Sequence, residues 1–437
     1  MSLATSSRVQ ELQKALHAKA KGSPEYRFYS LYDKVYRSDV LEEAWRRCKA
    51  NHGAPGVDDQ DFRKIEEYGT AKWLGELSED LKKKIYKPDN VRRVWIPKSN
   101  GKKRPLGIPT IRDRVVQTAA MIVLEAIFEA DLTEEQYAYR PERSALNAVQ
   151  KVHKYLSHGH HDVVDADLKG YFDTIPHAEL MKSIARRVAD GQMLALIKSW
   201  LETPVEETDE NGEKKVTTQN RDTGRGTPQG SPISPLFSNL YMRRFIVAWK
   251  KFGLEERLDA HIVNYADDFV ICCRGTADDA MHAMRAIMGK LKLTVNEEKT
   301  RIARLPEDGV DFLGYTIGRC FSPKDGHPFM GTRPSKKAIK EFLVGIREQT
   351  EPRWGFLDLE DQVKRLNRKL LGWWNYFRLD SVGRGCRKVD GYTRTRVRQW
   401  LLRKHKLSGK GVKRYSVQYL YKEMGLVQLE WLPRKFS

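Results

Sequence analysis

Short apolar runs separated by polar turns predict β-strands over the central part of the chain. Residues 261–264 and 269–273 are two such runs, and the segment between them carries Asp267 and Asp268 side by side. Two apolar runs of this length joined by a short polar segment are typical of a β-hairpin. The sequence therefore predicts a hairpin that presents two adjacent carboxylates at its turn.

A third apolar run, residues 163–168, predicts a strand with another pair of carboxylates. Side chains alternate across a strand, so Asp165 and Asp167 share one face and the apolar residues between them share the other. Mg²⁺ prefers oxygen ligands, and two such ions clamp the attacking and leaving oxygens of a phosphoryl transfer. We expect Asp167, Asp267 and Asp268 to be catalytic and to bind two Mg²⁺ ions, with Mn²⁺ as a substitute.

Other patterns place further elements around these strands. Residues 92–106, with the turn Ser99-Asn100-Gly101, predict a basic hairpin, and Asn211-Gly212 predicts a second hairpin turn. A short strand pair is expected over residues 309–317. Helical periodicity predicts helices from about Arg112 to Glu129, from Ser144 onward, from Ala178 to Val188 and from Ala277 to Leu293.

The two ends of the chain differ from its middle. Residues 1–24 have a helical pattern, and we expect them to be weakly anchored. Beyond about residue 334 the strand patterns fade, and residues 336–406 are helical, basic and aromatic. We place a domain boundary near residue 330.

The charge of the chain points to a polyanionic partner. Its 437 residues carry a formal net charge of +20, and nucleic acid is the usual partner of so basic a protein. Clustered acids in so basic a chain indicate metal-dependent chemistry on nucleic acid. The alternative interpretation is that the acids belong to two ordinary acidic turns. No membrane span or signal peptide is recognised, and the five cysteines have no metal spacing, so we expect a cytoplasmic protein. His158, His160 and His161 lie in a polar loop and give only weak support for a metal site.

Several motifs resemble those of one family. Residues 265–268 (Tyr-Ala-Asp-Asp) resemble the YxDD box of reverse transcriptases, and residues 165–177 are similar to their first palm motif. Residues 226–240 resemble the motif that packs under the incoming nucleotide. The resemblance narrows to group II intron-encoded reverse transcriptase/maturases through residues 96–109, 139–144, 293–301, 312–315 and 364–377.

This resemblance implies an α+β fold, a right-hand polymerase whose fingers and antiparallel palm sheet precede an α-helical thumb/maturase domain. The implied divisions are an N-terminal extension (1–24), fingers with part of the palm (25–160), palm (161–330), thumb/maturase or X domain (331–410) and a short basic tail (411–437). Because no nuclease signature follows residue 410, the chain resembles a member without an endonuclease domain.

The resemblance also implies roles for single residues. Lys98 and Arg104 would contact triphosphate oxygens, Phe172 would be the steric gate at the sugar 2′ position, and Lys299 would protonate the pyrophosphate. Gln229 completes the expected nucleotide-binding set. Trp373 and Phe377 are expected in the core beside a basic RNA-binding face made of Arg365, Arg368, Lys369, Arg394, Arg396 and Arg398.

The expected function is RNA-directed DNA polymerisation combined with binding of the intron RNA as a maturase. The expected partners are template and intron RNA, a DNA primer or target, and dNTPs, with no membrane and no obligate protein partner; in use, the protein would associate with the nucleoid. Two alternatives stay open: a splicing cofactor without enzymatic activity, and a free-standing group II-like reverse transcriptase used in DNA repair or phage defence.

Overall fold

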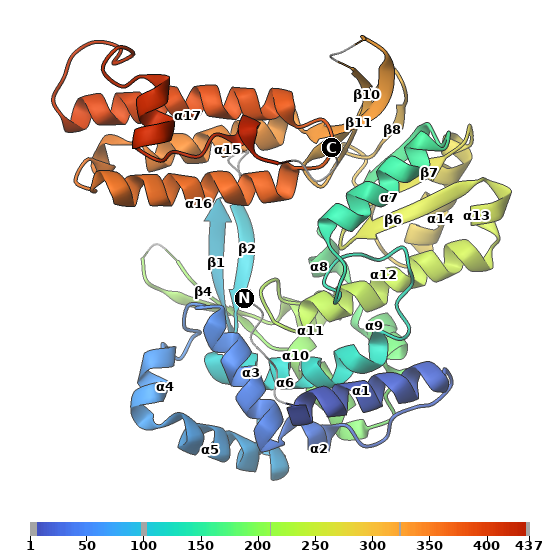
Figure 1. Ribbon diagram of the computed structural model, residues 1–437. Coiled ribbons are helices and arrows are strands. Elements are labelled where there is room, and N and C mark those ends of the chain that lie inside the picture. The colour runs from blue at the N-terminus through green and yellow to red at the C-terminus, as the bar shows by residue number, and fades with distance from the viewer. Residues whose placement is uncertain (1–6, 98–102, 210, 323–324, 434–437) are drawn as a thin grey trace.

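The computed structural model describes residues 7–97, 103–209, 211–322 and 325–433 of the chain. Three groups of elements are visible in Figure 1. The N-terminal helices are blue, a central region built around a β-sheet is green and yellow, and a layer of helices near the C-terminus is orange and red. A basic hairpin extends from the N-terminal group.

The N-terminal helices surround α6 (Ile111–Phe128), an apolar helix that is buried over most of its length. Thr110 caps α6 by accepting a hydrogen bond from the backbone N–H of Asp113, which fixes the start of the helix. The expected helix 112–129 is therefore confirmed to within one residue. Around it lie α1 (Ser7–Gly22), α2 (Tyr32–Val35), α3 (Ser38–Ala50), α4 (Phe62–Tyr68) and α5 (Thr70–Lys82).

Helix α1 is firmly packed, so the expectation of weak anchoring was wrong for residues 7–22. Val9, Leu16 and Ala20 are buried in the core that includes α6. The Gln13 side-chain amide also donates to the Ile122 carbonyl at 3.1 Å. The partner of the apolar stripe lies 109 residues downstream, so a local pattern could not reveal it.

A four-stranded sheet with the order β2-β1-β4-β5 adjoins this group. β1 (Val91–Pro97) and β2 (Lys103–Ile108) form the predicted basic hairpin, and β4 (Val205–Thr208) and β5 (Lys214–Thr217) form the second hairpin. β4 runs parallel to β1 and joins the two hairpins. Lys98 falls in the turn 98–102, outside the described residues.

The central sheet has the order β6-β7-β3-β8, with every neighbouring pair antiparallel, as the family resemblance implies. Its strands are β3 (Asp162–Asp167), β6 (Ala260–Tyr265), β7 (Asp268–Cys273) and β8 (Arg301–Arg304). The face that bears Val164 and Phe269 packs against α12 (Ser234–Lys251) and α14 (Ala277–Lys290). The opposite face packs against α7 (Ala145–Ser157), which begins at the capping box of Ser144.

The remaining helices of the central region connect these layers. His177–Ala185 forms α9, somewhat shorter than the helix expected from Ala178 to Val188. The others are α8 (Tyr171–Thr174), α10 (Gly191–Leu201), α11 (Gln219–Thr223) and α13 (Leu254–Arg257).

A small three-stranded sheet follows, with the order β11-β10-β9. β9 (Val310–Phe312) and β10 (Tyr315–Phe321) are the strand pair expected over residues 309–317. The sequence did not suggest β11 (Pro328–Pro334), because proline at both ends and Gly331 weaken a strand pattern. β11 contacts α7, and the His153 ring lies 2.8 Å from the Thr332 hydroxyl.

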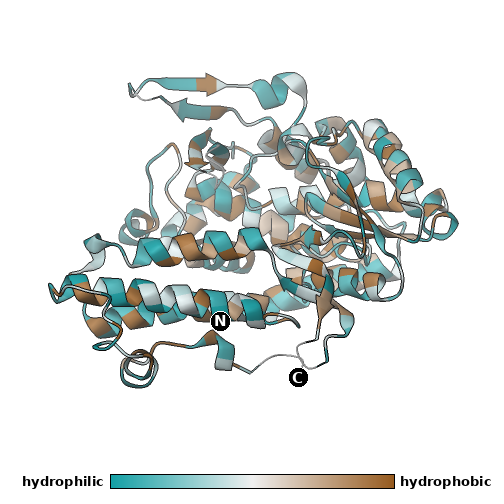
Figure 2. Cartoon of the chain, turned by 90° about the horizontal axis from the view of Figure 1, so that it is seen from above, coloured by the Kyte–Doolittle hydropathy of each residue, from teal (hydrophilic) through white to brown (hydrophobic). Residues whose placement is uncertain are grey.

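The C-terminal layer consists of α15 (Lys336–Gln349), the short 3₁₀ turn η1 (Pro352–Trp354), α16 (Leu359–Phe377) and α17 (Gly383–Lys404). Apolar and polar residues alternate along these helices in Figure 2, and the apolar positions supply the core. Trp373 and Phe377 are buried with their rings 5.0 Å apart, as the one-turn spacing predicts.

The chain after residue 410 packs on the same helices. Tyr415, Leu420 and Leu429 are buried, and the Asp390 carboxylate on α17 accepts the backbone N–H groups of Leu429 and Glu430. The described part of the expected tail is therefore a structural element of this layer. It includes the π-helical turn η2 (Tyr419–Glu423) and the 3₁₀ turn η3 (Leu429–Trp431).

Candidate active site

The register of the central sheet brings acids from two distant segments together. Asp167, the last residue of β3, lies directly opposite Asp268, the first residue of β7. Residues that face each other in an antiparallel pair have Cβ atoms about 4.5–5.5 Å apart, so both side chains reach the same small volume. Asp267 stands beside them, exposed, in the turn before β7.

The turn between β6 and β7 is held in an unusual backbone conformation. Ala266 has a φ of +58°, a left-handed value that costs energy for a residue with a side chain. Its carbonyl accepts a hydrogen bond of 2.7 Å from the side-chain amide of buried Asn264. This support fixes the turn and presents Asp267 at the sheet end.

The electrostatics of this end favour a cation. Burial, followed by the charges of Asp165, Asp267 and Asp167, raises the pKa of Asp268 to about 7. Burial also raises the pKa of Asp165 to about 6, although Arg301 at 3.5 Å works against that rise. The four carboxylates outnumber the two cations beside them, Arg301 and Lys299, and form an oxygen-rich donor set that fits hard divalent ions such as Mg²⁺.

Residues that follow helix α14 surround Asp167. The Asn296 side-chain amide donates to its carboxylate at 2.8 Å, and the Lys299 ammonium lies 3.1 Å from the same oxygen. The backbone N–H of Asn296 also donates to the Asp167 carbonyl at 2.8 Å. The expected Lys299 is thus brought to the acid cluster, and Asn296 is an additional member.

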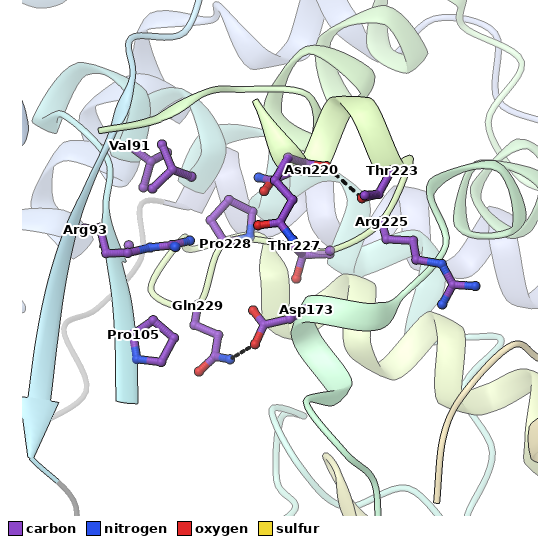
Figure 3. Close-up of a pocket in the computed structure, with 14 residues that line it drawn as sticks. Val91, Arg93, Pro105, Asp173, Asn220, Thr223, Arg225, Thr227, Pro228 and Gln229 are labelled. Atoms are coloured by element: carbon purple, nitrogen blue, oxygen red, sulfur yellow. Dashed lines mark hydrogen bonds between the residues drawn. The ribbon is translucent and has the colours of Figure 1, made fainter. Parts of the chain in front are cut away.

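A cavity of about 270 Å³ lies between the basic hairpin and the loop that contains Gln229. Figure 3 shows Arg93 reaching from β1 toward this loop and Gln229 pointing at Asp173 on α8. The Gln229 side chain donates to Asp173 at 3.1 Å and accepts from Arg104 at 2.9 Å. The structure therefore joins two of the expected nucleotide-binding residues directly.

The backbone of the β1–β2 hairpin is in direct contact with the backbone of the Gln229 loop. The Gly107 N–H donates to the Gln229 carbonyl at 2.6 Å. At Gly230, with a φ of +117°, a Cβ atom would come within 2.3 Å of the Gly107 carbonyl oxygen. Only glycine fits there, so the turn residues of this motif set the position of Gln229.

Phe172 and Tyr139 are two aromatic residues of the motifs that resemble the family. Phe172, on α8, is 9% exposed, and its carbonyl accepts the N–H of Thr227 at 2.7 Å. Tyr139 is half exposed; burial first and the charge of Asp267 second raise its pKa, while Arg104 opposes this rise. Tyr139 is therefore near both Asp267 and Arg104, a position that its motif alone did not reveal.

The six expected RNA-binding residues differ in their surroundings. Arg396 donates to the Thr350 hydroxyl at 3.0 Å and to two carbonyls, and Arg398 donates to the Tyr415 carbonyl at 2.8 Å. Arg365 covers the Trp354 ring at 3.7 Å. Arg368 is exposed, and Lys369 and Arg394 are partly exposed. Their role in RNA binding stays a prediction.

Some site residues were missing from the expected set. Asp165, Asn296 and Tyr139 lie at or near the acid cluster, and Arg93 and Asp173 line the cavity at the Gln229 loop. Asp165 could have been found, because it shares a strand face with Asp167. The position of the others depends on contacts between distant segments, which a sequence pattern does not contain.

Comparisons with known proteins agree with this geometry. The profile of the family described as "Reverse transcriptase (RNA-dependent DNA polymerase)" matches residues 96–317, and that of the "Group II intron, maturase-specific domain" matches residues 339–416. The chain belongs to the reverse transcriptase family, in the branch that carries the maturase-specific domain of group II introns.

Curated relatives point the same way. Protein YkfC of Escherichia coli is 33% identical over 76% of this chain and 93% of that protein. Group II intron-encoded protein LtrA of Lactococcus lactis is 29% identical over 66% of this chain and 57% of LtrA. The chain thus spans a little over half the length of LtrA. In the part of the chain that the structure describes, no helix is both long and apolar enough to cross a membrane.

Proposed function

We propose that the chain extends a DNA primer on an RNA template, with Asp167, Asp267 and Asp268 holding two divalent ions. The observation that carries this proposal is the register of β3 and β7, which sets Asp167 opposite Asp268 beside the exposed Asp267. Ions bound to such a cluster would supply the charge that activates the primer 3′-hydroxyl and stabilises the departing pyrophosphate.

The neighbouring side chains bind and orient the nucleotide. Arg93 lines the cavity at the Gln229 loop and Arg104 donates to Gln229, so both bring positive charge of the kind that triphosphate oxygens need. Phe172 closes the space next to the sugar and excludes a 2′-hydroxyl. The Lys299 ammonium holds a proton close to Asp167, where a leaving pyrophosphate can take it up.

The second part of the proposal is that the C-terminal layer binds intron RNA and assists its splicing. The maturase-specific match covers α15, α16 and α17, and the relative LtrA is named as a group II intron-encoded protein. Template RNA, intron RNA, a DNA primer and dNTPs are the proposed partners. Of the expected RNA contacts, exposed Arg368 is the strongest candidate.

Primer extension tests the polymerase proposal. Wild-type protein with an RNA template, an annealed DNA primer, dNTPs and Mg²⁺ should extend the primer, and Asp267→Asn should not. Asp279→Asn removes an equally exposed carboxylate from α14 and should extend normally. RNA affinity should be unchanged in both variants, which separates lost catalysis from lost binding. Robust extension by Asp267→Asn would contradict the assignment.

A further inference from the structure

A second cluster of metal-ligating side chains lies at the end of the central sheet opposite to the acids. It consists of His160, in the loop between α7 and β3, together with Asp259 and His261 at the start of β6. The register separates the two ends: Asp162 pairs with Cys273 here, and Asp167 pairs with Asp268 at the other end. The cluster is thus remote from the catalytic acids along the same strand.

The ligand atoms of the cluster converge. His160 Nε2 lies 3.0 Å from Asp259 Oδ1, and His261 Nε2 lies 3.3 Å from the same oxygen. One ligand atom from each of the three residues falls within 4.8 Å of the others. A tetrahedral zinc ion with bonds of about 2.0–2.1 Å separates its ligand atoms by about 3.3 Å, which is close to the two nitrogen-to-oxygen distances of 3.0 and 3.3 Å.

The hydrogen bonds of the two Nδ1 atoms determine whether the Nε2 atoms carry a proton or a lone pair. His160 Nδ1 lies 3.2 Å from the Tyr155 carbonyl, and a carbonyl oxygen only accepts, so this nitrogen carries the proton. His261 Nδ1 lies 2.9 Å from the Glu255 carboxylate and is protonated for the same reason. In neutral histidines, both Nε2 atoms therefore direct lone pairs at the Asp259 oxygen.

The two Nε2 lone pairs and the Asp259 oxygen lie close together, so positive charge between them would stabilise the arrangement. Two additional protons, one on each ring, or one divalent metal ion would satisfy the arrangement. The outer contacts fit a metal site, because a ligating histidine usually donates its other N–H to a carboxylate or a backbone carbonyl. Arg274 lies 3.5 Å from the second oxygen of Asp259, which leaves the first oxygen directed at the rings.

We propose that His160, Asp259 and His261 bind a zinc-class dication that joins the loop before β3 to the start of β6. His160 and Asp259 are 99 residues apart, so the ion would cross-link two distant segments. The His160 side chain is 8% exposed and the Asp259 side chain 46% exposed, so the ion is accessible from one side and its fourth ligand is water. Its role is to stabilise the palm, and the site takes no part in nucleotide transfer.

Zinc binding measured on the full-length protein tests the proposal. After treatment with a chelator, the protein is dialysed against Zn²⁺ with excess Mg²⁺, which occupies the acid cluster, and bound zinc is quantified by mass spectrometry. We expect about one zinc per chain in the wild type and none in His160→Gln or His261→Gln. Exposed His161, next to the site, provides the matched control, and His161→Gln should retain the zinc.

Two further measurements separate the possible outcomes. Co²⁺ in place of zinc should give the intense visible absorption of a tetrahedral site, and His261→Gln should lose it. Glu255→Gln should weaken zinc affinity roughly 10- to 100-fold, because Glu255 only orients His261. Circular dichroism checks that each variant is folded.

Absence of zinc in the folded wild type would overturn the proposal in favour of doubly protonated rings. Zinc that persists in both folded histidine variants but is lost in Asp267→Asn would place the ion at the acid cluster, and would overturn it equally.

Discussion

The acid end of the central sheet and the C-terminal helical layer contrast in how they use charged residues. At the sheet end, Asp167, Asp267 and Asp268 lie together, the Lys299 ammonium pairs with Asp167, and Asp268 still has its pKa raised to about 7. In the helical layer, Arg396 and Arg398 are engaged by backbone carbonyls of their own chain. An excess of negative charge marks a site that needs a cation, whereas charge that is bound by the chain's own carbonyls maintains the fold.

This contrast divides the residues with expected functional roles into two groups, one that stabilises the fold and one that acts in catalysis or binding. An arginine that is held by backbone carbonyls of its own layer contributes mainly to stability, and its substitution should lower the free energy of unfolding. A residue of the acid cluster, including Asp167 and its partner Lys299, should affect catalysis when changed. The following predictions test this division, from the largest expected effect to the smallest.

Removing the charge at the end of β3 should have the largest effect. Asp167→Asn should lower the rate of primer extension by about 10³-fold or more, because the donor set for the metal ions loses its central carboxylate. Asp162→Asn removes a carboxylate from the other end of the same strand and should retain the wild-type rate. Single-turnover extension measures both. Equal losses would indicate a general effect on the sheet.

Lys299→Met should lower the rate of nucleotide addition by about 10²-fold, the usual effect of losing a general acid. The apparent affinity for the primer–template should stay close to that of the wild type. Lys290→Met, at the exposed end of α14, serves as the control. Pre-steady-state kinetics distinguishes slower chemistry from weaker binding, and a loss confined to binding would contradict the proposed proton transfer.

Phe172→Val should change sugar selection more than it changes the rate. Opening the space beside the 2′ position should raise ribonucleotide relative to deoxynucleotide incorporation by roughly 10- to 200-fold. Tyr171→Phe, in the neighbouring residue, removes only the hydroxyl that donates to the Ser238 carbonyl, and should keep the wild-type ratio. An unchanged ratio in Phe172→Val would show that another residue is the gate.

Arg396→Ala should destabilise the C-terminal layer by about 1–3 kcal/mol, because the carbonyls that bind its guanidinium group lose their donor. Arg368→Ala, at an exposed position on α16, should change stability by less than about 0.5 kcal/mol. Chemical denaturation measures the two midpoints. Equal destabilisation would remove the distinction between the two arginines.

The smallest effect is expected in RNA binding. Arg368→Ala should weaken intron-RNA affinity a few-fold and lower the slope of log affinity against log salt by about one unit, as the loss of one phosphate contact does. Asn375→Ala, an uncharged exposed position on the same helix, should leave the slope unchanged. A slope identical to that of the wild type in Arg368→Ala would exclude this residue from the RNA surface.

Elements with strong local patterns were predictable from the sequence. The β6–β7 hairpin, β3 and helices α6 and α7 lie where alternation, periodicity and the Ser144 cap placed them. The acid cluster could be anticipated because its residues stand at the ends of those strands. The sequence also indicated the burial of Trp373 and Phe377.

Features that depend on distant partners were not predictable. The packing of α1 depends on α6, and the structural role of Arg396 depends on carbonyls 46 and 49 residues away. The approach of Arg104 to Gln229 joins residues that lie 125 positions apart. Likewise, His160 was visible in the sequence only as one of three neighbouring histidines, and its relation to Asp259 and His261 required the fold.

The central claim is that Asp167, Asp267 and Asp268 bind divalent ions, and metal-directed backbone cleavage tests it most directly. Fe²⁺ with a reductant and peroxide cuts the chain next to the bound iron, and mass spectrometry locates the cuts. We predict cuts near residues 165–168 and 265–269 that excess Mg²⁺ suppresses and that are absent in Asp267→Asn. A protein that supports primer extension but shows no Mg²⁺-sensitive cut in these two segments would contradict the account.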